Sequence, residues 1–145
     1  MFNTLITIMA FQYLGTIYKW GGNDTRGMDC SGFVLKVLSD VGYDLPDMTA
    51  NALYNYCINK NGQSSKECDS LIFFGRTNKI THVAISLGKV NGKWLMVEAA
   101  GAGRESLNMS KDDLLRIDAR VRIKPVDHRS DLVASLLIDY NHEKY

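Results

Sequence analysis

The sequence predicts an α+β fold, in which helices from the first part of the chain pack on an antiparallel sheet built from the second part. Two observations support this prediction. Up to about residue 60, apolar side chains recur at helical spacing and are interrupted by glycine and proline turns. From about residue 70, apolar residues come in short or alternating runs, which are typical of strands. The 145 residues are expected to form one domain, residues 1–145, because that length is enough to bury a core.

Three helices are predicted before residue 60. Glycine favours the left-handed conformation that ends a helix, and threonine favours the position that caps its start. Residues 18–27, 45–47 and 59–66 are expected to form the loops and turns between helices and sheet. In chain order the helices cover Met1 to Phe11, ended by Gly15; Cys30 to about Asp40, ended near Gly42; and Met48 to Ile58, capped by Thr49.

The second part of the chain is expected to supply the sheet. Asn-Gly is a strong hairpin signal, so the two strands that flank residues 91–92 should pair. Proline lacks a backbone donor, which places the strand that ends at residue 125 near an edge. The expected elements are strands at Ser70–Gly75, Thr81–Leu87, Lys93–Ala99 and Ala119–Pro125, a capped helix at Ser110–Leu115, and a final helix from Asp131 to about Asn141.

The composition is that of an ordinary globular protein, with 46% hydrophobic and 23% charged residues, and it argues against a disordered chain. A formal net charge of +1, without a basic cluster, argues against nucleic acid as the main partner. The apolar start of the chain lacks the basic residues and the cleavage site of a signal peptide. It is also too short and too polar to span a bilayer, so no membrane insertion is expected.

Three cysteines leave at least one thiol unpaired within the chain. Cys57 falls on a predicted helix, and Cys68 falls in a polar segment before a strand. The sequence is compatible with a Cys57–Cys68 disulfide and with two buried or incidental thiols. It contains no Cys-x-x-Cys pair and no histidine cluster, so we expect no zinc site and no cofactor.

Cys30 is the strongest candidate for a catalytic residue because it lies on the first turn of the second predicted helix. The free N–H groups and partial positive charge at a helix start stabilise an anion. A cysteine at this position is expected to favour the reactive thiolate form. The backbone N–H of Cys30 would also form the main part of an oxyanion hole.

His82 begins a strand-like run and is the candidate general base. A lone strand histidine is more often structural, but a helix-start cysteine in the same chain favours a catalytic pair. The aliphatic residues of the run should face the core, so His82 should face the less apolar side, where a thiol could reach it. Alternation gives His82, Ala84 and Ser86 on one face and Val83, Ile85 and Leu87 on the other.

Glu98 is the candidate third group because it is an acidic residue within an apolar strand, where it needs a partner. It would hold the imidazole of His82 in one tautomer. A strict two-residue Asn-Gly turn would pair Glu98 with Ile85 and place it on the face opposite His82. The catalytic interpretation therefore requires a longer loop, centred on Val90. A surface carboxylate at a strand end is the alternative.

Tyr18 lies ahead of Cys30 in a loop of aromatic residues and glycines. Its phenol could donate a hydrogen bond to an oxyanion or to a substrate carbonyl. Simple packing is the alternative role for an isolated tyrosine.

Four motifs stand in the order and approximate spacing of the NlpC family of bacterial cell-wall peptidases, which the sequence resembles over about residues 11–103. The resemblance implies a reduced papain-like fold. It also implies hydrolysis of the γ-D-glutamyl–diaminopimelate (or lysine) bond in peptidoglycan stem peptides. Asp-Cys-Ser-Gly and His-Val-Ala-Ile together are a specific signal, although either alone would be weak. The motifs are Tyr18–Gly22, Asp29–Val34, Leu71–Gly75 and His82–Ile85.

The same resemblance assigns roles to individual residues. A carboxylate beside the nucleophile suits an ammonium group, although helix capping is an equally good role for it. The implied roles are Cys30 as nucleophile, His82 as base, Glu98 as third group, Tyr18 as active-site tyrosine, and Asp29 and Ser31 as contacts to the free amino end of the substrate.

The sequence departs from the family pattern at Asp69 and Ser70, which stand where Gly-Asp is usual, and in a long segment between His82 and Glu98. No wall-binding module or secretion signal is recognised, which suggests a phage lysis or tail-associated enzyme, or export to the wall by another apparatus. Rival functions are an N-acetylmuramoyl-L-alanine amidase, a thioester acyltransferase, and a non-catalytic tail or wall-binding domain.

Overall fold

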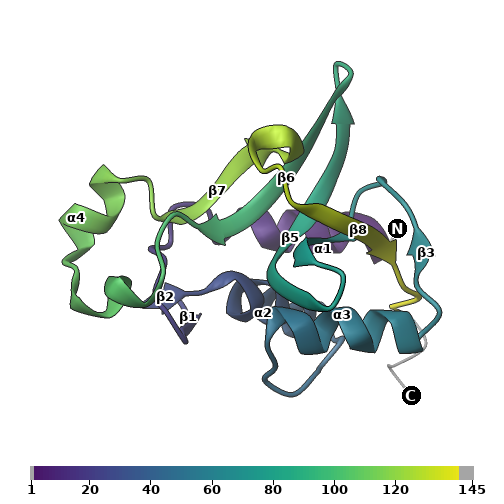
Figure 1. Ribbon diagram of the computed structural model, residues 1–145, viewed down its shortest axis with the longest axis horizontal. Helices are drawn as coiled ribbons and strands as arrows, with labels where there is room; N and C mark the ends of the chain where they lie inside the picture. The colour runs from purple at the N-terminus through teal and green to yellow at the C-terminus, as the bar shows by residue number, and fades with distance from the viewer. Residues whose placement is uncertain (1, 141–145) are drawn as a thin grey trace.

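The computed structural model describes residues 2–140, with side chains from residue 5 onward. Helices come first along the chain, and strands dominate the second part (Figure 1). The three helices before residue 60 confirm the predictions at those places; Met1 lies outside the described residues. These helices are α1 (Phe2–Phe11), α2 (Cys30–Asp40) and α3 (Ala50–Asn59).

The main sheet has six strands in the order β3-β8-β4-β5-β6-β7, and neighbouring strands are antiparallel. β7 lies at one edge, as its terminal proline predicted. A short separate hairpin, β1 (Asn23–Asp24) with β2 (Gly27–Met28), forms within the expected loop ahead of α2. The sheet strands are β3 (Gln63–Ser64), β4 (Leu71–Arg76), β5 (Lys79–Val90), β6 (Lys93–Ala100), β7 (Arg120–Pro125) and β8 (Leu132–Leu137).

Short helical segments connect the last strands. After β6 come η1 (Arg104–Asn108) and α4 (Lys111–Arg116), and η2 (Val126–His128) follows β7. The hydroxyl of Ser110 accepts a hydrogen bond from the Asp113 N–H at 3.1 Å, so the predicted capped helix is confirmed. In Figure 1, α4 stands out at the left, while α2 and α3 run below the strands. Within residues 2–140 no helix is long and apolar enough to cross a membrane.

The final helix predicted from Asp131 to about Asn141 is wrong. Residues 132–137 form β8, which lies between β3 and β4, and Asn141 lies outside the described residues. The run Leu-Val-Ala-Ser-Leu-Leu is short and apolar, so its pattern suits a strand as well as a helix. Without β8 the buried strand β4 would expose a row of unpaired N–H and C=O groups, and pairing with β8 satisfies them.

The sheet separates a large core from a small one. On one face, α2 contributes Phe33 and Leu38 to a cluster that includes Val83 and Ile85 of β5. On the other face a smaller cluster lies beside η2 and contains Ile72, Phe74, Ala84, Met96 and Val126. The aliphatic face of β5 therefore packs against the helices, as predicted, and the face that carries His82 is the opposite one.

The hairpin between β5 and β6 differs from the expected loop. Val90 pairs directly with Lys93, so the turn has only two residues, both with positive φ, and the prediction of a longer loop is wrong. A β-bulge instead interrupts the pairing between Ser86 and Gly88, which leaves Leu87 as an extra residue in β5. The bulge shifts the register by one residue, which turns Glu98 to the face of His82, although it lies across from Ala84 and not directly across from His82 as the longer loop would have placed it.

Candidate active site

Cys30 is the first residue of α2 and is half-buried. The helix starts there because Asp29 caps it: the backbone of Asp29 is extended, and its Oδ1 accepts a hydrogen bond from the Gly32 N–H at 2.8 Å. The other carboxylate oxygen, Oδ2, accepts from the Gly21 N–H at 3.0 Å. Asp29 therefore fixes both the helix start and the loop before it, which is the capping role that the sequence left open.

Two glycines allow the loop to lie directly against the nucleophile turn. A Cβ atom on Gly32 would lie 2.1 Å from the carbonyl oxygen of Gly22, and a Cβ on Gly22 would lie 2.3 Å from the carbonyl oxygen of Gly27. Both distances are far shorter than side-chain contacts allow, so only glycine fits at these positions. The backbone N–H of Asp29 also donates to the Gly22 carbonyl at 3.0 Å. The glycine motifs of the sequence are thus explained by close backbone approach.

His82 and Glu98 form a buried pair behind the thiol. The Nε2 atom of His82 lies 2.7 Å from Oε1 of Glu98, and the two residues are 6% and 0% exposed. Burial lowers the pKa of His82, but hydrogen bonds to Cys30 and Glu98, with their negative charges, outweigh burial and leave that pKa raised. Since Glu98 occupies Nε2, the nitrogen that remains for the Cys30 thiol is Nδ1.

The β-bulge explains how Glu98 reaches His82. Beyond the bulge Ile85 pairs with Val97, so Glu98 lies across from Ala84 rather than from Ile85. Ala84 and His82 share a strand face. The structure therefore brings Glu98 and His82 together, as predicted, by a route that the turn length alone did not indicate.

Arg122 is a site residue that the sequence reasoning missed. It lies directly across from Glu98 in the β6–β7 ladder, and its Nε donates to Oε2 of Glu98 at 3.1 Å. Its Nη1 donates to the Asp118 carbonyl at 2.9 Å. Burial raises the pKa of Glu98, yet His82 and then Arg122 outweigh it and leave the pKa lowered. The sequence did contain a signal for Arg122. Glu98 is an acid in an apolar strand and needs a cation, and the later strand carries basic residues at alternate positions.

Tyr18 is buried, and its backbone N–H donates to the Ala119 carbonyl at 3.0 Å. Burial raises the pKa of its phenol, and the negative charges of Cys30 and Asp29 raise it further. The hydroxyl therefore stays protonated and can donate a hydrogen bond near the thiol. Packing and donation are compatible roles for this residue.

Two cavities lie beside Cys30. One, of about 280 Å³, borders the start of α2 and includes Asp29, Ser31 and Asp47 in its lining. The other, of about 440 Å³, has Thr81 in its lining, and the Thr81 carbonyl oxygen lies 4.0 Å from the Cys30 Sγ. Ser31 is itself almost buried, and its Oγ lies 3.5 Å from the Asp29 carboxylate.

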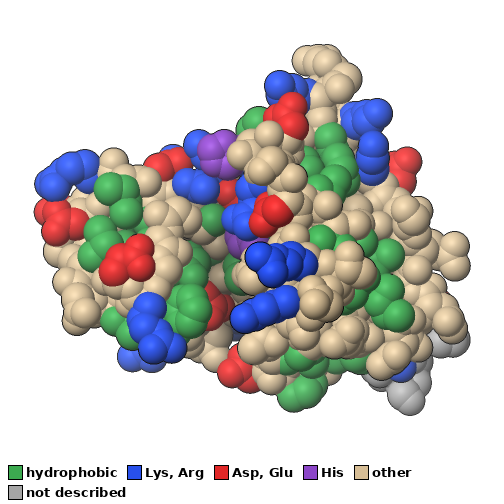
Figure 2. All heavy atoms as spheres, viewed as in Figure 1, with side chains coloured by type: hydrophobic (Ala, Val, Ile, Leu, Met, Phe, Trp, Pro, Cys, Tyr) green, Lys and Arg blue, Asp and Glu red, His purple; other side chains and the backbone are tan. Residues whose placement is uncertain are grey.

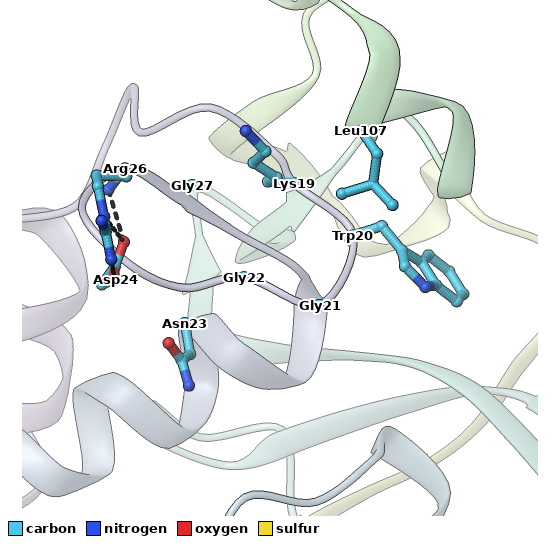
Figure 3. A pocket seen from close by; sticks show the side chains of 9 residues that line it. All are labelled: Lys19, Trp20, Gly21, Gly22, Asn23, Asp24, Arg26, Gly27 and Leu107. Carbon is cyan, nitrogen blue, oxygen red and sulfur yellow. Dashed lines mark hydrogen bonds and ion pairs between the residues drawn. The ribbon is translucent and has the colours of Figure 1, made fainter.

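A third cavity, of about 360 Å³, lies along the loop that precedes α2 (Figure 3). Figure 3 shows Trp20 and Leu107 at one end of its lining and the Asp24–Arg26 ion pair at the other. The guanidinium of Arg104 lies 5.5 Å from the centre of the Trp20 ring. This cavity does not include Cys30, His82 or Glu98 in its lining.

The remaining cysteines are free thiols, so the structure contains no Cys57–Cys68 disulfide. Cys57 is buried, and burial raises its pKa to about 12, which makes it a poor nucleophile. Cys68 is exposed, and its thiol lies 3.2 Å from the Leu87 carbonyl oxygen. Among the residues that the structure describes, no three His, Cys, Asp or Glu side chains gather where they could hold a metal ion.

The arrangement can carry out nucleophilic acyl transfer. It combines a thiol at a helix start, an imidazole in contact with it, a carboxylate that orients the imidazole, and a protonated phenol nearby.

Comparison with known proteins gives a consistent family. Residues 15–116 match the model of the NlpC/P60 family. The chain is 34% identical to "Probable endopeptidase p60" of Listeria seeligeri over 101 residues, which are 70% of this chain and 18% of that protein. The chain thus corresponds to about a fifth of the length of this relative.

Solved structures share the fold. The NlpC/p60 domain of the peptidoglycan hydrolase SagA superposes with a TM-score of 0.64 at 25% identity, covering 94% of this chain and 98% of that domain. RipD from Mycobacterium tuberculosis, described as a non-catalytic NlpC/p60 domain protein adapted to peptidoglycan binding, gives a TM-score of 0.63 at 18% identity, covering 94% and 96% of the two chains. The papain-like α+β fold is therefore shown.

Proposed function

Because the chain belongs to the NlpC/P60 family, we propose that it is a cysteine endopeptidase that cuts peptide bonds in bacterial peptidoglycan. The observation that carries this proposal is the buried His82–Glu98 pair, completed by Arg122, next to the Cys30 thiol at the start of α2. A domain that only binds the wall has no need of a buried carboxylate to hold a histidine against a thiol, and burial of such groups costs stability unless each is paired.

The reaction proceeds through a thioester. The Cys30 thiolate attacks the carbonyl carbon of the scissile amide, and the Cys30 backbone N–H with the Tyr18 hydroxyl stabilises the oxyanion. The C–N bond then breaks, and the His82 imidazolium gives its proton to the leaving amine. Water next attacks the thioester, neutral His82 takes the proton from that water, and the acid product leaves with Cys30 restored.

The scissile bond is the γ-D-glutamyl–diaminopimelate (or lysine) bond of a stem peptide. The free amino end of the substrate occupies the cavity lined by Asp29, Ser31 and Asp47, where two carboxylates favour an ammonium group. Both oxygens of Asp29 already accept backbone hydrogen bonds, so Asp47 has more capacity for that ammonium. An amidase or acyltransferase reaction and delivery by a phage or secretion apparatus remain predictions from the sequence.

The proposal is tested by digesting purified muropeptides, and the free stem peptides without their sugars, and identifying the products by mass spectrometry. The native protein should cut after γ-D-Glu, Cys30→Ala should cut neither substrate, and Cys68→Ala should behave as the native protein because that thiol lies outside the site. Muropeptides and free stem peptides that both remain intact in all three digests would disprove hydrolysis. Cleavage at muramoyl–alanine would establish the amidase instead.

The amino-end assignment has its own test. A peptide that begins with free L-Ala should be cut roughly ten- to a hundred-fold faster than its N-acetylated form, because a charge-assisted hydrogen bond contributes about 1.5–3 kcal/mol. Asp47→Asn should remove most of this preference while it leaves the Asp29 cap in place. Equal rates on both peptides would contradict the assignment.

A further inference from the structure

The cavity next to Thr81 has a charge pattern that the proposed reaction does not yet explain. Its lining consists of Gly75, Arg76, Lys79, Thr81 and Asp131, and its volume is about 440 Å³. Arg76 and Lys79 stand directly across from each other where β4 and β5 meet. Like charges opposite each other in a ladder are unfavourable unless an anion lies between them or close by.

The surrounding acids do not neutralise these two cations. Asp131, the only acidic residue in the lining, is held by Arg129 through hydrogen bonds of 3.0 and 2.9 Å. Among the residues that the structure describes, neither Arg76 nor Lys79 forms an ion pair with a carboxylate, and both are exposed. In the view of Figure 2, Lys and Arg side chains lie near the centre of the molecule, with His, Asp and Glu side chains beside them. The cavity therefore carries a net positive charge.

The cavity lies close to both Cys30 and His82. Its Thr81 is the residue before His82, and the Thr81 carbonyl oxygen lies 4.0 Å from the Cys30 Sγ. Gly75, another lining residue, donates its backbone N–H to the Asp131 carbonyl at 2.9 Å, and its neighbour Phe74 lies across from His82 with the two ring centres 5.5 Å apart. The leaving amine must reach His82 to take its proton.

We propose that Arg76 and Lys79 form a binding subsite for a free carboxylate on the leaving residue of the substrate. This inference rests on the proposed endopeptidase function and specifies its substrate. As the C–N bond breaks and the leaving nitrogen takes the proton of His82, the two cations hold the carboxylate of the departing residue. The same cations repel a leaving residue that carries only an ammonium group.

Two carboxylates of a stem peptide have this chemistry. Diaminopimelate carries one at the far end of its side chain, where lysine has only an ammonium group. A peptide that ends at the leaving residue carries another, its α-carboxylate. The subsite thus favours diaminopimelate over lysine when the peptide continues, and a free over a blocked end when it does not.

The test compares five substrates that all begin with L-Ala-γ-D-Glu. Three continue to D-Ala and differ only at the third residue: diaminopimelate, diaminopimelate with an amidated side-chain carboxyl, and lysine. Two end at lysine, one as the free acid and one as the amide. If the subsite binds the side-chain carboxylate, kcat/KM should be about five- to ten-fold higher for diaminopimelate than for its amide or for lysine. If it binds the α-carboxylate, the same gain should appear for the peptide that ends in free lysine over its amide. Each exposed ion pair contributes up to about 1 kcal/mol. The gain should lie mainly in KM.

The double variant Arg76→Ala/Lys79→Ala should remove this preference, whereas Lys89→Ala, an exposed lysine farther along β5 and outside this cavity, should keep it. Equal kcat/KM on all five substrates, or a preference that survives the double variant, would overturn the inference. A binding measurement separates the subsite from the proposed endopeptidase activity. Calorimetry measures the affinity of Cys30→Ala for the leaving dipeptides diaminopimelyl-D-Ala and Lys-D-Ala. A preference for diaminopimelyl-D-Ala supports the subsite even without turnover, and equal binding refutes it.

Discussion

Replacing Glu98 by Gln would test whether the carboxylate holds the histidine as an imidazolium. The change keeps the size of the side chain and removes its charge, with the His82 Nε2 contact at 2.7 Å left in reach. A hydrogen bond to a charged partner contributes about 1.5–3 kcal/mol, which corresponds to roughly one to two pKa units. Glu98 helps to raise the pKa of His82 in the native protein, so removing its negative charge should lower that pKa.

The expected result is a shift of the pH profile. The imidazolium is present below the pKa of His82 and is lost as pH rises through it, so the alkaline limb of kcat/KM should move down by about one to two pH units. The assay is a kcat/KM profile from about pH 5 to 10 on one stem peptide. An unchanged alkaline limb in a folded Glu98→Gln protein would refute the role of the carboxylate.

Stability provides a second readout through Arg122, whose side chain is 12% exposed. Glu98→Gln removes the closer of its two carboxylate partners, while the Asp118 carbonyl at 2.9 Å and the Asp118 carboxylate at 3.5 Å remain. The weakened pairing of this nearly buried cation should lower the free energy of unfolding by about 1–3 kcal/mol. Adding Arg122→Met should recover much of that loss and leave the alkaline limb displaced, because the negative charge beside His82 is not restored. Urea denaturation of the native protein, Glu98→Gln and the double variant measures both changes.

Three further predictions concern other residues. Iodoacetamide should label Cys30 faster than exposed Cys68 and buried Cys57, as followed by mass spectrometry of timed digests; equal rates would argue against an activated thiol. Gly32→Ala should lower the free energy of unfolding by about 1–3 kcal/mol and reduce activity, since its Cβ would meet a backbone carbonyl; a melting curve like the native one would show that the loop can move aside. Asp69 is buried, and burial raises its pKa to about 6 from 3.8. The protonated carboxyl therefore favours the folded protein fully below about pH 4, and this contribution to stability is lost as pH rises through 6. Asp69→Asn should therefore raise the free energy of unfolding at pH 7.5 by up to about 3 kcal/mol and change it little at pH 4; the same gain at both pH values would contradict this reasoning.

Local patterns were sufficient to predict the positions of Cys30 and His82. A cap, an apolar run and a glycine stop mark α2, and strand alternation identifies the face of His82. These features depend on neighbours within a few residues, so the sequence displays them directly.

The rest depends on pairing between distant segments, which a single sequence does not display. Glu98 was correctly placed beside His82, but for the wrong reason: the turn has two residues, and the bulge at Leu87 supplies a register shift of one residue. Gly88, which follows the bulge and has a positive φ, was the one local sign of it. Arg122 required knowledge of which strand lies next to β6. The last strand, residues 132–137, was mistaken for a helix because its partner β4 is about sixty residues away in the chain.

Because the extra residue Leu87 sets which face Glu98 points to, the hairpin between His82 and Glu98 tolerates only insertions or deletions of an even number of residues. Fifteen positions separate His82 from Glu98, and losing or gaining any one of them reverses the side of the sheet to which Glu98 points. Changes of two residues keep it in place. Hairpins of many lengths can therefore serve this site, provided that the lengths differ by even numbers or that another bulge corrects the count. At the exposed tip of this hairpin, far from the thiol, an insertion or deletion of two residues should then be neutral, whereas a change of one residue should inactivate the site.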